Sequence, residues 1–92
     1  MSLNHASRYM LFSFENQAQA TKAYDRVKTY EKARLIPLPP EIDKGCGLSL
    51  RIREEDFKEI FEIFKEENIE YAQVFKFYHE DFKRKIEKYV FW

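Results

Sequence analysis

Blocks of hydrophobic residues along the chain predict four short strands. Residues 8–14 (RYMLFSF) are aromatic and apolar, as is typical of a central strand, and 71–78 (YAQVFKFY) form a similar block. Residues 34–38 (RLIPL) predict an edge strand, because the proline cannot donate a backbone hydrogen bond to a neighbour. Residues 48–53 alternate between apolar and polar side chains, which indicates a strand with one buried face.

Apolar residues recur at helical spacing in three further segments. The first begins after Asn16, a residue that can cap a helix, and continues to Tyr30. The second follows the acidic run 54–56, which suits the positive end of a helix dipole, and ends near Asn68. The third covers residues 80–92, where four apolar residues keep the same spacing. We therefore expect three helices.

This order of elements predicts an α+β fold. The succession β-α-β-β-α-β matches a ferredoxin-like arrangement, in which a four-stranded antiparallel sheet carries two helices on one face, here with an added C-terminal helix. Residues 1–7 are expected to be disordered or derived from an expression vector, 8–78 to form the domain, and 79–92 to form a helical extension. The other face of the sheet is also apolar, so we expect the C-terminal helix or a second copy of the chain to cover it. Phe91 and Trp92 favour docking of the terminus.

Composition narrows the possible functions. Sixteen basic and sixteen acidic residues cancel in a chain of 92 residues, which argues against nucleic acid as a partner. No apolar run approaches the roughly 20 residues that span a bilayer, and the signal-peptide pattern of a basic start followed by an apolar stretch does not appear in the sequence. A single cysteine forms no internal disulfide, so the cytoplasm is the expected location and no membrane partner is expected.

All the glycine in the chain lies in one tripeptide, Gly45-Cys46-Gly47, around the only cysteine. Glycine permits positive φ angles and leaves the main chain accessible, so the pattern indicates a thiol on an open loop. The alternative is a small apolar side chain packed in the core. Without a second cysteine or a spaced set of carboxylates, His5 and His79 predict no metal site, and no cofactor is expected.

Residues 35–51 (LIPLPPEIDKGCGLSLR) resemble the selenium/sulfur carrier-like family, a group of small domains. The family pattern is matched in order by 12–14 (FSF), 36–39 (IPLP), Cys46-Gly47 and Leu50-Arg51, and the resemblance extends over about residues 8–78. The chain departs from the family by having residues 43–45 (DKG) where serines usually precede the cysteine. It also lacks a glycine after the first helix.

The resemblance implies that Cys46 accepts a sulfane sulfur or selenium atom from a donor protein and releases it to an acceptor protein. Gly45 and Gly47 would shape the loop, while Lys44 and Arg51 would support the reactive thiolate, which cations stabilise. Any enzymatic activity would then be a thiol-dependent transfer. The alternative function is a protein-interaction or homodimerisation module in which the cysteine is incidental and both cations are ordinary surface charges.

Overall fold

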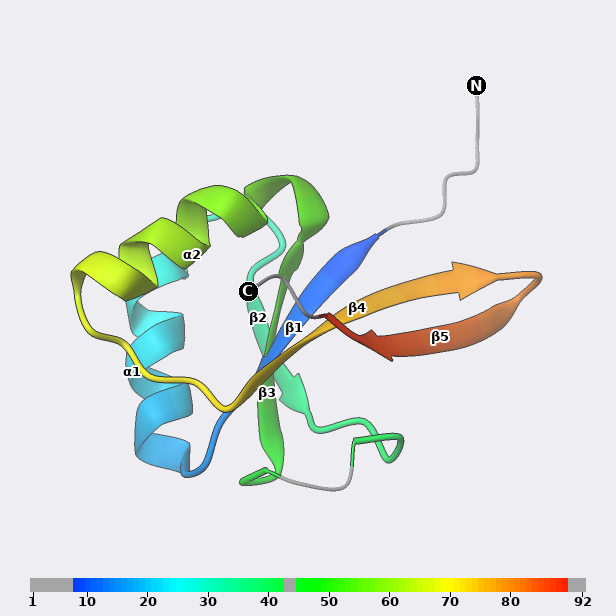
Figure 1. Ribbon diagram of the computed structural model, residues 1–92, viewed down its shortest axis with the longest axis horizontal. Coiled ribbons are helices and arrows are strands. Elements are labelled where there is room, and N and C mark those ends of the chain that lie inside the picture. The colour runs from blue at the N-terminus through cyan, green and yellow to red at the C-terminus, as the bar shows by residue number, and fades with distance from the viewer. Residues whose placement is uncertain (1–7, 43–44, 90–92) are drawn as a thin grey trace.

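Five antiparallel strands form a single sheet in the computed structural model, which describes residues 8–42 and 45–89 (Figure 1). The strand order is β2-β3-β1-β4-β5. Along the chain the strands are β1 (Tyr9–Ser13), β2 (Arg34–Pro37), β3 (Leu48–Arg53), β4 (Gln73–Glu80) and β5 (Lys83–Lys88). Two helices, α1 (Gln17–Val27) and α2 (Phe57–Glu66), lie together on one side of the sheet, and a short 3-10 turn, Glu54–Asp56, leads into α2.

The predicted four-stranded ferredoxin-like sheet with a C-terminal helix is wrong. The segment expected to be helical forms β5, which pairs with β4 from Glu80↔Lys83 to Phe75↔Lys88. The helical spacing of Phe82, Ile86 and Tyr89 is misleading, because Phe82 lies in the turn between the two strands. Pairing with β4 satisfies backbone groups that would otherwise form an open sheet edge. Residues 1–7 and 90–92, with the expected disorder and the expected docking of Phe91 and Trp92, lie outside the described residues.

The larger core lies between the sheet and the two helices. Asn16 caps α1 as predicted, because its Oδ1 accepts a hydrogen bond from the backbone N–H of Gln19 at 2.9 Å. The ring of Phe12 on β1 lies at the centre of this core, 4.9 Å from that of Phe64 on α2 and 5.2 Å from that of Tyr71. Thirteen buried residues make up this helix-side cluster: Met10, Phe12, Phe14, Ala20, Ala23, Val27, Ala33, Leu50, Ile52, Ile60, Phe64, Ile69 and Val74.

The opposite face of the sheet, called the open face below, carries a smaller apolar cluster. Its buried members are Leu11, Phe75 and Phe77 from the sheet and Ile42 from the loop after β2. Leu38 from the same loop packs against them. Part of the face expected to need a C-terminal helix or a second chain is therefore covered by residues 38–42.

None of the helices in the described part of the chain combines the length and the apolar character that crossing a membrane requires.

Candidate functional site

The Gly45-Cys46-Gly47 tripeptide lies between β2 and β3 and is held by two backbone hydrogen bonds. The N–H of Cys46 donates to the carbonyl of Phe14, at the end of β1, over 3.0 Å. The carbonyl of Gly47 accepts from the N–H of Leu38 over 2.9 Å. The tripeptide is therefore attached to the ends of β1 and β2.

The two glycines serve different purposes. Gly47 has a φ of +94°, yet nothing lies within 4 Å of the position that a Cβ would occupy, so conformation alone requires glycine there. Gly45 has a φ of +154°, and an added Cβ would lie 3.0 Å from Leu38 Cδ2 and 3.5 Å from the carbonyl oxygen of Phe14. Gly45 therefore also permits the close approach of this loop to β1.

The Cys46 thiol is neither fully displayed nor sealed in the core. The side chain is half-buried and packs against the helix-side cluster. Its Sγ donates a weak hydrogen bond to the carbonyl of Leu48 at 3.8 Å, the one polar contact of the thiol among residues 8–42 and 45–89. The thiol thus keeps part of its surface open to solvent while its other side rests on apolar neighbours.

The first part of the same loop is tied to the far edge of the sheet. The Arg84 guanidinium on β5 contacts both carboxylate oxygens of Glu41, at 3.0 and 3.2 Å. A hydrogen bond from the backbone N–H of Glu41, together with the ion pair with Arg84, lowers the pKa of the Glu41 carboxyl from its ordinary value. With Ile42 buried in the open-face cluster, this pair anchors the loop before the cysteine.

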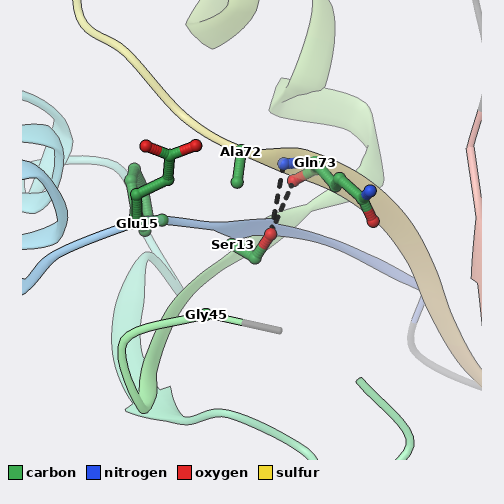
Figure 2. Close-up of a pocket in the computed structure, with 6 residues that line it drawn as sticks. Ser13, Glu15, Gly45, Ala72 and Gln73 are labelled. Carbon is green, nitrogen blue, oxygen red and sulfur yellow. Dashed lines mark hydrogen bonds between the residues drawn. The ribbon is translucent and has the colours of Figure 1, made fainter. Parts of the chain in front are cut away.

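A hollow of about 370 Å³ opens beside Gly45, where β1 ends and β4 begins (Figure 2). The Ser13 hydroxyl points at the backbone of Gln73, accepting from its N–H at 3.1 Å, with its own proton directed at the Gln73 carbonyl at 3.5 Å. The hollow is lined by Ser13, Phe14, Glu15, Gly45, Ala72 and Gln73. Cys46 is next to the hollow in sequence but is not among its lining residues.

The cations predicted to support the thiolate are not brought to it by the described structure. Arg51 is five residues beyond Cys46, and its partner in β1 is Leu11, a member of the open-face cluster. Cys46 packs on the helix side, so the two side chains lie on opposite faces of the sheet. Lys44 lies outside the described residues.

Sequence reasoning gave no role to Ser13, Glu15 and Gln73, the polar residues of the hollow. A serine within an otherwise apolar strand was the available signal for Ser13, because a buried hydroxyl needs a hydrogen-bond partner. Glu15 and Gln73 carried no such signal, since both follow or begin a strand as ordinary polar residues. Within the described ranges no three His, Cys, Asp or Glu side chains gather as they would around a metal ion.

Comparison with protein-family models matches most of the chain. The family described as "Putative Se/S carrier protein-like" matches residues 9–76, about three quarters of the sequence, and confirms the resemblance seen in the motifs. No curated protein and no solved structure matched the chain.

Proposed function

The chain belongs to the Se/S carrier-like family, and from this premise we propose that Cys46 carries a sulfane sulfur or selenium atom between proteins. The observation that supports the proposal most directly is the position of the only cysteine. Its thiol is half-buried, and the cysteine lies between two glycines on a loop that two backbone hydrogen bonds attach to the sheet. A carrier needs one such thiol and no resolving cysteine, because the carried atom leaves by exchange.

The proposed exchange is balanced without an outside oxidant. The Cys46 thiolate attacks the terminal sulfur of a donor persulfide, a new S–S bond forms on Cys46, and the donor leaves as a thiolate when its own S–S bond breaks. In the release step an acceptor thiolate attacks the terminal sulfur on Cys46, and Cys46 leaves as the thiolate. A perselenide donor reacts in the same way through an S–Se bond. The reaction needs a free thiol, which a reducing compartment such as the cytoplasm maintains.

The surroundings of Cys46 support a protected atom. The half-buried side chain can shield a carried sulfur on the side that faces the helix-side cluster. A thiolate has no proton to donate to Leu48, so we expect Sγ to turn from that carbonyl toward solvent when it reacts. The hollow beside Gly45 gives a partner protein a recess next to the cysteine loop.

Loading of the protein with inorganic polysulfide, followed by intact-mass measurement, tests the proposal. Wild-type protein should gain the mass of one sulfur atom, lose it on treatment with cyanide, and Cys46→Ser should gain nothing. The matched control combines Cys46→Ser with Thr29→Cys, which moves the thiol to an exposed turn after α1. We expect the persulfide on Cys46 to survive longer than the one on Cys at position 29, because only Cys46 is partly shielded.

Equal loading and equal lifetime in the two proteins would contradict the proposal. Such a result would show that Cys46 behaves as any surface thiol does. The family assignment would then stand without a carrier role for this cysteine.

A further inference from the structure

The last strand of the sheet, β5, has one side that pairs with no described strand. It stands at the end of the strand order, and the β4–β5 hairpin extends away from the two helices (Figure 1). The N–H of Tyr89, directly after β5, donates to the carbonyl of Val74, so every second residue counted back from Tyr89 also faces β4. The residues between them, Arg84, Ile86 and Lys88, therefore direct their backbone N–H and C=O groups to the free edge. A row of this kind is a template for another strand.

The opposite edge of the sheet is less suited to accept a strand. There β2 has only four residues and ends at Pro37, which has no backbone N–H. Pro39 and Pro40 follow it closely. By contrast, β5 has six residues and no proline. Strand addition is therefore favoured at β5.

The free edge is positively charged. Four of the six residues of β5 are basic and one is acidic. Arg84 is neutralised by Glu41 at 3.0 Å, and the single acid, Glu87, accepts a hydrogen bond from a tyrosine hydroxyl at 2.7 Å. Lys85 and Lys88 form no ion pair with a described residue, and their cross-strand partners on β4 are an uncharged tyrosine and phenylalanine. These two lysines leave the edge with positive charge that the described structure does not offset.

This charge decides which kind of strand fits. A second copy of β5 would place basic residues against basic residues, and like charges on facing strands are destabilising. An acidic strand would instead form favourable cross-strand pairs. Between the basic residues, Ile86 is half-buried and packs against the open-face cluster, so it offers an apolar contact at the centre of the edge.

We propose that the free edge of β5 binds an extended acidic segment of a partner protein, which adds to the sheet as a further antiparallel strand. Backbone hydrogen bonds to the outward groups of β5 supply affinity, and side chains supply specificity. The segment carries an apolar residue opposite Ile86 and acidic residues opposite Lys85 and Lys88. The proposal does not rest on the carrier role of Cys46.

Titration of the isotope-labelled protein with the blocked peptide TETVEET, followed by NMR, tests the site. The valine is placed opposite Ile86 and the glutamates opposite the basic residues. We expect saturable shifts along β5 and slower hydrogen exchange at the amides of Arg84, Ile86 and Lys88, because these N–H groups would donate to the peptide. The basic peptide TKTVKKT should not bind. An acidic peptide with N-methylvaline, which lacks the donor opposite Ile86, should bind more weakly.

The variant Ile86→Pro removes an outward N–H and leaves the hydrogen bonds to β4 in place. Because a backbone hydrogen bond is lost and the ring obstructs the incoming strand, we expect the affinity to fall about tenfold or more. Ile86→Ala is the matched control: it loses the same side chain but keeps the N–H, and should bind more tightly than Ile86→Pro.

A second test remains should Ile86→Pro fail to fold. Removal of both free cations, by Lys85→Gln with Lys88→Gln, should weaken binding of the acidic peptide about threefold to tenfold. Lys22→Gln with Lys58→Gln changes the net charge equally at exposed helix positions and should bind as the wild type does.

Three outcomes would overturn the proposal. The first is binding of the acidic peptide without slower exchange at the three outward amides. The second is equal binding of the N-methylated peptide. The third is equally tight binding of a single-stranded oligothymidylate of the same charge, which would show that the lysines attract any polyanion.

Discussion

Replacement of Phe82 by glycine should stabilise the protein. Asp81 and Phe82 form a two-residue turn between the paired residues Glu80 and Lys83, with φ angles of +53° and +65°. Such a turn needs positive φ at both positions, and glycine is strongly preferred at the second. Phe82 is instead a large aromatic residue with a relative exposure of 104%. It therefore bears the conformational cost without gaining burial.

The size of the effect follows from these observations. A left-handed conformation costs an L-residue about 1–2 kcal/mol. Glycine returns part of the gain, about 0.5–1 kcal/mol, because it loses more backbone entropy on folding. No burial is lost, since the Phe82 side chain is already fully solvated. We expect a net increase of about 1 kcal/mol in the free energy of unfolding, equivalent to a rise in Tm of roughly 4–8 °C for a domain of this size.

Urea denaturation followed by circular dichroism measures this change, with Phe82→Ala as the matched control. Alanine removes the same aromatic ring but keeps a Cβ, so it retains the conformational cost and should stabilise far less than glycine. The denaturant slope should be the same in all three proteins. Equal stability of the two variants would refute the reasoning, because the ring and not the backbone would then decide the outcome.

Two further predictions concern the cysteine loop. Gly47→Ala should lower the free energy of unfolding by about 1 kcal/mol, although a Cβ meets no atom there, because its φ of +94° disfavours any side chain; urea denaturation showing unchanged stability would contradict a conformational role. The Glu41–Arg84 pair should stabilise the fold at neutral pH and lose its effect in acid. The pKa of Glu41 in the folded protein lies below its ordinary value. The contribution of the pair to stability is therefore present above the unfolded pKa, about 4.3, and disappears as the pH falls through the folded pKa. The difference in Tm between wild type and Glu41→Gln should therefore shrink in this range, whereas a difference independent of pH would exclude the ion pair as its cause.

The candidate site was predictable in part. The tripeptide around Cys46 stood out in the sequence because no other glycine occurs, and the structure shows why glycine is needed at both positions. The support expected from Arg51 stays a prediction, and the described structure places the Arg51 and Cys46 side chains on opposite faces of the sheet. Arg51 pairs with Leu11 of the open-face cluster, whereas Cys46, which lies in the loop before β3, packs against the helix-side cluster.

The sequence by itself determined the helices and strands whose side chains alternate or recur around a buried core, from β1 through β4. In each of these segments the apolar side chains face a buried core, so their spacing along the sequence was sufficient to predict a helix or a strand. Only the tertiary structure decided that residues 83–88 add a fifth strand and that Leu38 and Ile42 cover part of the open face. The fifth strand depends on pairing with β4. The position of Leu38 and Ile42 depends on contact with open-face residues that are distant in the sequence. A segment as polar as β5 gains its structure mainly from the hydrogen-bonding edge that β4 offers, which no local pattern can report.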